Sequence, residues 1–400
     1  MAISMFEKRK TSALVAPPIS VIDAARTLAP RIRTCSDVIE RERRLPAELV
    51  EAMAGAGLFR MCVPQKLGGG EVDVATLIRA IEELSHADGS VGWCAMIGAT
   101  SGVVSGYLAE DAAGEIYGGA GAISGGALAP KGRAIVTEGG YTVTGRWPFA
   151  SGCEHCDWLM GSCVVVDHGV PRLLPNGAPD ARLMLFRSSD ARIIDTWSVA
   201  GLCGTGSHDI AVADIFVPEG HSLSLISDPP RQPGPLYAFP VFGLLALGIA
   251  GVAIGIARRA IEELVSLASE KTPTGSRRFL AERSPIQVQV AQAEATLRAA
   301  RALLFETVIE TWETALAHGE ISVGQRALLR VAATHAATSA AGAVDLMYNA
   351  GGGTSIYTTS PLQRCFRDVH TLTQHVMVAP ATYELTGRLF LGLETDVSML

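Results

Sequence analysis

The stretch Tyr141–Trp158, YTVTGRWPFASGCEHCDW, joins a predicted strand to a loop that could bind a flat polar ligand. Apolar and polar residues alternate at its start, after a Gly-Gly turn, as in a half-buried strand. Residues 149–152 break the alternation, and the small side chains among them leave backbone N–H groups and the Ser151 hydroxyl free to contact the edge of a heteroaromatic ring. An ordinary strand end with a tight turn explains the same residues, so this segment alone leaves both interpretations open.

Cys153 and Cys156 flank a Glu and a His in a cluster that resembles half of a zinc site. Structural zinc requires four ligands, and no second Cys-x-x-Cys follows. Eight cysteines without a framework pattern are typical of free thiols in a reducing compartment. We therefore expect free thiols and no metal site.

The bulk composition favours a globular protein and excludes several partners. A net charge of −7 and basic runs no longer than Lys8–Lys10 or Arg41–Arg44 argue against nucleic acid. Phe242–Ala257 is apolar but shorter than the ~18 to 20 residues that a membrane span requires, which favours a buried helix. The first residues lack the apolar region of a secretory signal, so we expect a cytoplasmic protein. No G-x-G-x-x-G or Walker loop is present, so no NAD(P)H site is visible.

Three segments of different character must position the groups that could do chemistry. Helical spacing dominates residues 1–120, short β-branched runs dominate residues 121–228, and long helical periodicity dominates residues 229–400. We predict an N-terminal all-α domain, a central β domain and a C-terminal antiparallel helical bundle. The bundle helices are predicted at residues 242–269, 285–318, 322–349 and 374–391, after a proline-rich linker at residues 228–240.

Two broad motifs accompany this order of domains. Leu58–Gly70 resembles the opening "GLF…P…GGG" segment of the acyl-CoA dehydrogenases, and Gly351–Gly353 followed by Arg367-Asp368 resembles their "GG…RD" region. The resemblance spans nearly the whole chain and implies the acyl-CoA dehydrogenase fold, which is mainly α with a central β-barrel domain and a C-terminal four-helix bundle. It also implies a homotetramer.

Four further segments resemble the flavin-dependent monooxygenases of that fold, the oxygenase components of two-component hydroxylases. The resemblance implies that reduced FMN or FAD comes from a separate NAD(P)H flavin reductase, that O2 forms a C4a-hydroperoxyflavin, and that a small aromatic or phenolic substrate is hydroxylated. The alternatives are an N- or S-oxygenase of the same fold, an acyl-CoA dehydrogenase, and a catalytically idle binding protein. The segments are GRWPFASGCEHCDW at 145–158, TWSVAGLCGTGSHD at 196–209, SPLQRCFRDVHTLTQHV at 360–376 and APATYELTGRLFLG at 379–392.

The resemblance places two histidines where an acyl-CoA dehydrogenase would carry its catalytic Glu. His370 and His375 follow Arg367-Asp368, and no acid stands in that position. A histidine suits oxygenation, because it can hold a peroxide and help a phenol to lose its proton near neutral pH. His375 is the first choice for this role and His370 is the competitor, with a structural histidine as the alternative for each.

The same resemblance implies contacts to the flavin ring. Ser151 would hydrogen-bond the flavin N5 region or the peroxide, with a loop-capping serine as its alternative. Trp147 and Phe149 would wall the ring system, although strand alternation makes at least one of them a core residue. Cys203 replaces a frequent Arg, which puts a charge contact there in doubt. Further ring contacts are expected at Ala150, Gly204, Thr205 and Ser207.

Other contacts are implied at the phosphate and substrate ends. Arg278 would contact a flavin phosphate from a neighbouring subunit, with a solvated basic loop as its alternative, and Gly352 and Gly353 would supply backbone donors to that ligand. Trp93 and His86 are the candidates for substrate contact. A core tryptophan and a capping or packing histidine are their respective alternatives.

Overall fold

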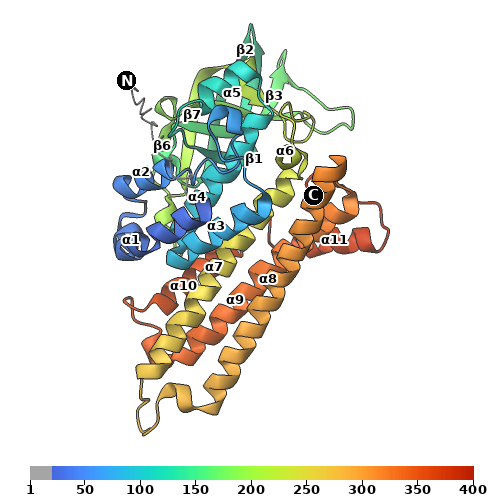
Figure 1. The fold of residues 1–400 in the computed structure, drawn as a ribbon. Coiled ribbons are helices and arrows are strands. Elements are labelled where there is room, and N and C mark those ends of the chain that lie inside the picture. Colours follow the sequence, from blue (N-terminus) through green and yellow to red (C-terminus); the bar gives the residue numbers. More distant parts are fainter. Residues whose placement is uncertain (1–19) are drawn as a thin grey trace, which may run out of the picture.

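The computed structural model describes residues 20–400, so the charged Lys8–Lys10 run and the absence of a secretory signal lie outside the described residues. The elements follow the predicted order of helices, sheet and helices, and the predicted fold class is confirmed (Figure 1). Capping side chains fix two of the early helices, since Ser20 accepts from Asp23 N–H and Asp73 accepts from Thr76 N–H. The early helices are α1 (Val21–Glu42), α2 (Ala47–Gly55), α3 (Val74–Ala87), α4 (Gly89–Ser101) and α5 (Glu110–Tyr117).

The central segment forms one eight-stranded sheet. Its strand order is β6-β7-β2-β1-β3-β5-β8, with β4 paired to β3. The β1–β3 pair is parallel, and the other pairs are antiparallel. The strands are β1 (Ser124–Thr137), β2 (Gly140–Ala150), β3 (Trp158–Asp167), β4 (Val170–Pro171), β5 (Ala181–Arg187), β6 (Arg192–Ile194), β7 (His208–Pro218) and β8 (Ser222–Leu223).

A bulge at the end of β2 sets the direction of the side chains that follow. The β2–β7 register shifts between Trp147 and Ala150, and Phe149 has a positive φ of 64°. The shift leaves Phe149 69% exposed, whereas Trp147 is fully buried and Ser151 is 5% exposed. The bulge therefore turns the Ser151 hydroxyl toward the interior.

The C-terminal segment is a bundle of long helices around α7 (Figure 1). The three longest helices begin and end within two residues of their predicted bounds. The predicted last helix at residues 374–391 is wrong, because prolines begin two shorter helices and leave residues 373–380 as a connecting segment. The predicted linker also contains one helical turn, α6. The elements are α6 (Pro235–Ala238), α7 (Val241–Glu270), α8 (Ser284–His318), α9 (Val323–Gly351), α10 (Pro361–Leu372) and α11 (Ala381–Phe390).

Helix α7 has the length and apolar composition of a membrane span, and it is the one helix in residues 20–400 that does. However, 89% of its most apolar window is buried inside the protein. Small residues allow its neighbours to approach, since a Cβ on Gly255 would lie 2.5 Å from the Glu82 carbonyl oxygen of α3. Helix α7 is thus the central core helix that the sequence predicted.

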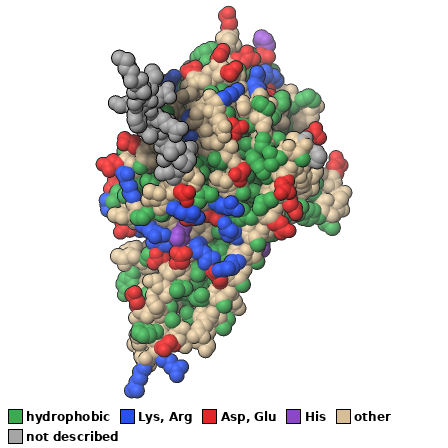
Figure 2. Space-filling view, in the orientation of Figure 1, with side chains coloured by type: hydrophobic (Ala, Val, Ile, Leu, Met, Phe, Trp, Pro, Cys, Tyr) green, Lys and Arg blue, Asp and Glu red, His purple; other side chains and the backbone are tan. Residues whose placement is uncertain are grey.

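The surface carries mixed charge. On the face shown in Figure 2, basic and acidic side chains are interspersed across the waist of the molecule. Ion pairs join neighbouring helices, namely Arg301–Glu82 between α8 and α3, Arg258–Glu294 between α7 and α8, and Arg26–Glu83 between α1 and α3.

Candidate active site

Trp93 and Ser151 meet in the interior, between α4 and the end of β2. The Trp93 indole N–H donates to the Ser151 hydroxyl over 2.9 Å. Ser151 lies 2.7 Å from Ser207, and Ser207 lies 2.7 Å from Thr205. These four side chains are between 1% and 7% exposed. The structure thus joins four predicted site residues from three elements in one buried hydrogen-bonded chain.

The last member of this hydrogen-bonded series, Thr205, determines which hydroxyl donates in each of its hydrogen bonds. Thr205 donates its hydroxyl proton to the Leu202 carbonyl over 2.8 Å. Each hydroxyl has one proton, so Ser207 must donate to Thr205 and Ser151 must donate to Ser207. Ser151 then accepts from Trp93 and retains one lone pair. In this arrangement the remaining capacity of Ser151 is that of an acceptor.

The Trp93 ring also contacts His375. The two rings meet edge to face, with centroids 5.7 Å apart. Met377 N–H donates to His375 Nδ1 over 3.2 Å, so we assign the proton of the neutral ring to Nε2. Burial, and then the nearby charge of Arg330, lower the pKa of His375 to about 4. At neutral pH His375 is therefore an uncharged hydrogen-bond donor.

The turn that carries Thr205 and Ser207 is fixed from two sides. Gly152 N–H donates to the Thr205 carbonyl over 2.8 Å, which ties the β2 loop to the turn. Asp368 of α10 accepts from Leu202 N–H over 2.6 Å and so holds Leu202, whose φ is +52°. The sequence reasoning used Asp368 only as a mark of the fold and missed this role. No periodicity signals it, because the bond joins residues far apart in the chain.

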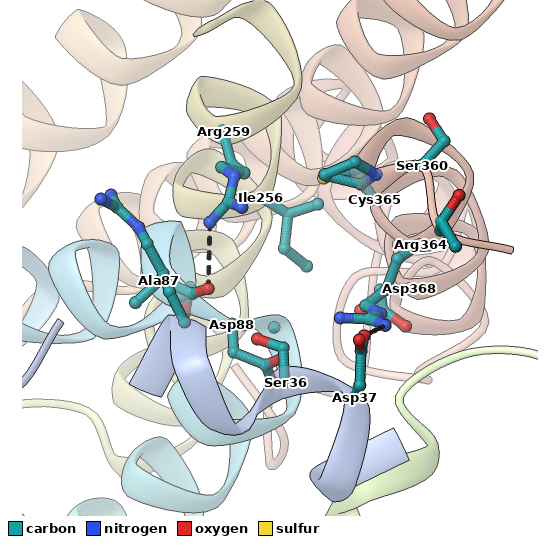
Figure 3. Close-up of a pocket in the computed structure, with 15 residues that line it drawn as sticks. Ser36, Asp37, Ala87, Asp88, Ile256, Arg259, Ser360, Arg364, Cys365 and Asp368 are labelled. Atoms are coloured by element: carbon teal, nitrogen blue, oxygen red, sulfur yellow. Dashed lines mark hydrogen bonds and ion pairs between the residues drawn. The ribbon is translucent and has the colours of Figure 1, made fainter. Parts of the chain in front are cut away.

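A second buried aspartate supports α4. Asp88 accepts from Ser90 N–H and Val91 N–H and thereby caps the helix that carries Trp93. Asp88 and Asp368 line one cavity of about 150 Å³ between α1, α3, α7 and α10 (Figure 3). Arg259 borders this cavity and donates to the Ala87 carbonyl, and Arg364 pairs there with Asp37. Burial and the charge of Asp88 raise the pKa of Asp368 to about 7.

One predicted ring contact, Trp147, requires correction, and two others, Ala150 and Gly204, are closely surrounded by protein atoms. Trp147 is enclosed by the sheet, where its indole N–H donates to the Ser162 carbonyl over 2.7 Å. A Cβ on Gly161 would lie 2.5 Å from its ring, so Trp147 is a core residue in a glycine-lined cradle and not the wall of a ligand site. Ala150 is fully buried. At Gly204 a Cβ would lie 2.1 Å from Ile39 Cγ2, so this glycine allows the approach of α1.

Phe149 is placed differently from Trp147. Its exposed ring meets Trp197 edge to face, with centroids 6.1 Å apart. Trp197 is held by a hydrogen bond from its indole N–H to the Leu202 carbonyl. Phe149 thus stays available as a ring contact at the rim of the turn, and Cys203 lies nearby with its thiol directed to the Val199 carbonyl.

The structure does not bring His370 or His86 to the buried chain. His370 bonds to Asp345 of α9 over 2.8 Å and packs on Phe366. His86 bonds to Glu262 over 2.7 Å and to Arg33 over 3.2 Å. Each histidine therefore connects its helix to neighbouring helices, away from the buried hydrogen-bonded residues. This corresponds to the structural alternative given for each.

The predicted phosphate contacts lie at the far end of the bundle. Lys271 at the end of α7 donates to the Gly351 carbonyl, and Gly352 and Gly353 follow at once. Arg278 lies in the exposed turn between α7 and α8. Arg330, which is near His375, precedes Gly352 by 22 residues along α9, or about 33 Å at about 1.5 Å per residue. Within a single chain, the predicted phosphate contacts therefore lie far from the predicted ring contacts near His375.

A carboxylate base is absent where an acyl-CoA dehydrogenase needs one. Between residues 369 and 392, all of which the structure describes, Glu384 is the single acid, and it is exposed on α11. Asp368 is buried and bonded to the 202–207 turn. The position beside Trp93 is occupied by His375.

Comparison with known proteins identifies related chains. Residues 22–116 match the N-terminal domain of acyl-CoA dehydrogenase, and residues 247–380 match its C-terminal domain. Indole-3-acetate monooxygenase of Pseudomonas putida is 36% identical over 88% of this chain and 89% of its own. The flavin-dependent monooxygenase oxygenase subunit HsaA of Mycobacterium tuberculosis (strain CDC 1551 / Oshkosh) is 30% identical over 95% of this chain and 98% of its own. The structure of XiaF from Streptomyces sp. in complex with FADH2 and glycerol is similar, with a TM-score of 0.85, 25% identity, and coverage of 94% and 95%.

Proposed function

This chain belongs to the acyl-CoA dehydrogenase family and, within it, to the oxygenase components of flavin-dependent monooxygenases, and from this premise we propose that it hydroxylates a small aromatic carboxylate beside Trp93, Ser151 and His375. The chain is a flavin-dependent enzyme that uses O2, and a separate reductase supplies its reduced flavin. The observation that carries the proposal for the site is the contact of Trp93 with both Ser151 and His375.

The buried hydroxyl chain fits a reduced flavin. Ser151 retains a lone pair once Trp93 has donated to it, and reduced flavin carries an N–H at N5 where oxidised flavin has none. Ser151 would therefore hold the reduced ring at N5, while Thr205 and Ser207 keep the hydroxyl of Ser151 in the accepting orientation. Phe149 would contact the ring at its rim. When bound, the flavin supplies the activation of O2.

His375 would act at the oxygen side of the site. Its Nε2–H can donate to an oxygen atom without carrying a charge of its own. Such a donor stabilises negative charge as it develops on oxygen, and it costs little reorganisation because its hydrogen bond from Met377 fixes the ring. The proton-donating role is thus favoured over that of a base.

Water exclusion is supplied by the apolar residues around Trp93. Met96 and Ala99 of α4 pack with Leu244 and Leu247 of α7 in the same buried cluster as Trp93. A dry wall limits loss of the activated oxygen to water and strengthens the hydrogen bonds inside the site. Trp93 itself would lie between the flavin-holding serine and the histidine.

The far phosphate contacts support an assembly in which subunits complete each other's sites. Because about 33 Å of α9 separates the His375 end from Gly352, Arg278, Gly352 and Gly353 would serve a flavin held by another copy of the chain. A homotetramer in the cytoplasm is the corresponding proposal. FMN and FAD both remain candidates, since they share the ring contacts proposed for Ser151.

The substrate proposal comes from relatives. Two relatives, from Pseudomonas putida and Acinetobacter baumannii, are named indole-3-acetate monooxygenase and are 36% and 32% identical to this chain. We therefore propose an arylacetate such as indole-3-acetate as the substrate. The test is to supply reduced flavin from a reductase, add indole-3-acetate and isotopically labelled O2, and analyse the product by mass spectrometry. One labelled oxygen atom in the product is expected. Consumption of O2 with no labelled product would contradict the proposal.

A further inference from the structure

Arg330 on α9 is a buried cation without a carboxylate partner. Arg330 is 4% exposed, and its Nε–H has no hydrogen-bond partner among the residues that the structure describes. Its other groups donate to backbone carbonyls, Nη1 to Met399 and Nη2 to Met377 over 3.2 Å. Among residues 20–400, no Asp or Glu side chain lies within ion-pair distance of Arg330. A buried charge is strongly unfavourable unless a counter-charge, a ligand or water compensates it.

Thr334 presents a second orphaned group on the same face of α9. It lies one helical turn after Arg330, a spacing at which side chains are neighbours. Thr334 is fully buried, and within residues 20–400 its hydroxyl has no hydrogen-bond partner. Two orphaned polar groups, both able to donate, thus lie one turn apart on α9. Buried polar atoms are rarely left unpaired, so their joint occurrence indicates a missing acceptor.

This pair of residues is coupled to the candidate active site through residues 375–377. Arg330 Nη2 donates to the Met377 carbonyl, and Met377 N–H donates to His375 Nδ1. The charge of Arg330 is close enough to lower the pKa of His375. His375 in turn contacts Trp93. A single residue, Met377, therefore links Arg330 to His375, which is the proposed hydrogen-bond donor to oxygen.

We propose that Arg330, assisted by Thr334, binds the carboxylate of an aryl carboxylate substrate and so selects anionic over neutral aromatic compounds. The inference rests on the proposed function, which places the aromatic ring near His375. A guanidinium presents a planar fork of donors that matches the two oxygens of a carboxylate, and the Nε–H edge is the edge left without a partner. The carboxylate is bound and is not altered by the reaction.

The chain offers a matched control for Arg330. Arg326, one turn earlier on α9, also donates to carbonyls of the C-terminal segment, Val397 over 2.9 Å and Leu400 over 3.2 Å. Arg326 is less buried than Arg330, and its Nε is not among the orphaned atoms. In Figure 1 the C-terminus of the chain lies on the side of the bundle that is nearest the sheet. Loss of Arg326 therefore loosens the same segment without removing the proposed carboxylate site.

The experiment compares indole-3-acetate with 3-methylindole, which has the same ring and lacks the carboxylate. Arg330→Met is expected to lower kcat/KM for indole-3-acetate on the order of 100-fold, because one partner of a buried charge pair is lost. Arg330→Met also removes the hydrogen bond to the Met377 carbonyl, so any loss that acts through His375 lowers turnover of 3-methylindole as well. The ratio of the two kcat/KM values therefore isolates the contribution of the carboxylate. Thr334→Val should weaken the preference about tenfold, and Arg326→Met should leave it unchanged. An unchanged preference in Arg330→Met would overturn the inference.

Binding is measured alongside, so that a failure of the proposed function is distinguishable. Indole-3-acetate, phenylacetate and 3-methylindole are titrated by calorimetry into wild-type protein and Arg330→Met. Carboxylate binding that requires Arg330, without turnover, would support the carboxylate site and sink the proposed substrate. Absence of carboxylate binding to the wild type, or equal binding to the variant, would overturn the site itself.

Discussion

The Trp93 indole donates a hydrogen bond to the Ser151 hydroxyl over 2.9 Å, and the same ring meets His375 edge to face. This relationship brings together residues 58 and 282 positions apart from Trp93 along the chain. It depends on the cap of α4, the bulge of β2 and the segment after α10. The site is therefore assembled by all three parts of the fold.

His375 is expected to be required for product formation, whereas His370 is not. His375→Ala should lower product formation by about 10²- to 10³-fold and divert O2 to hydrogen peroxide, because the donor to oxygen is lost. His375→Gln should recover part of the activity, since an amide N–H can replace the imidazole donor. The measurement is product and peroxide yield per reduced flavin.

His370→Ala is the matched control for that experiment. The His370–Asp345 pair is partly exposed, so activity should stay within about twofold of the wild type. Equal losses in His370→Ala and His375→Ala would show that the assignment of His375 is wrong.

The activity should not titrate at the ordinary pKa of histidine. The pKa of His375 is lowered to about 4 by burial and by Arg330, so the ring stays neutral from pH 8 down to about pH 5. By linkage, the same shift contributes stability above the unfolded pKa of about 6.5 that is lost as pH falls toward 4. A pH profile of product formation should be level across this window. An acidic limb near pH 6.5 that disappears in His375→Gln would contradict this prediction.

Stability should rise when Asp368 is replaced by Asn. The pKa of Asp368 is raised to about 7, so its contribution to stability is full below the unfolded pKa of about 4 and is lost as pH rises through 7. An Asn oxygen can still accept from Leu202 N–H, and the amide carries no charge. Thermal unfolding at pH 8 should show Asp368→Asn to be more stable by up to about 4 kcal/mol, with little difference at pH 4. A variant that is less stable than the wild type at both pH values would refute the claim that the buried Asp368 carboxylate destabilises the protein at pH 8.

The fold was predictable because its signals are periodic and local. The long apolar helices, the alternating strands and the cap at Asp88 follow from residues near one another in the chain. The last helix was placed wrongly because Pro380 interrupts a pattern that otherwise reads as helical from residue 374, and α11 begins only after it. Trp147 was misassigned because its enclosure depends on Gly132 of β1 and Gly161 of β3, which alternation within β2 does not reveal.

The candidate site was predictable only where a resemblance identified its segments. Ser151, Ser207 and His375 came from motifs, whereas the bonds that orient them join distant parts of the chain. The roles of Asp368 and Arg330 depend on burial and on missing partners, which no sequence pattern encodes. The roles of these two residues were therefore found from the structure alone.

Subunit mixing should reveal that Arg278 acts on a neighbouring site. Ser151→Ala and Arg278→Ala should each reduce activity at limiting flavin. When the two variants are unfolded together and reassembled, some sites regain a native Ser151 from one chain and a native Arg278 from another. Activity should then exceed that of either variant alone. No gain, with mixed oligomers shown by mass spectrometry, would place Arg278 outside the flavin site.

The most direct test of the central claim is stopped-flow mixing of the reduced-flavin-loaded protein with oxygenated buffer. An oxygenase whose site is formed by Trp93, Ser151 and His375 should show a lag before the visible band of oxidised flavin appears, and Ser151→Ala and His375→Ala should shorten that lag. Product should accumulate in the same mixture when an aryl carboxylate is present. Immediate formation of oxidised flavin and hydrogen peroxide in the wild type, with bleaching of oxidised flavin by an acyl-CoA instead, would contradict the account.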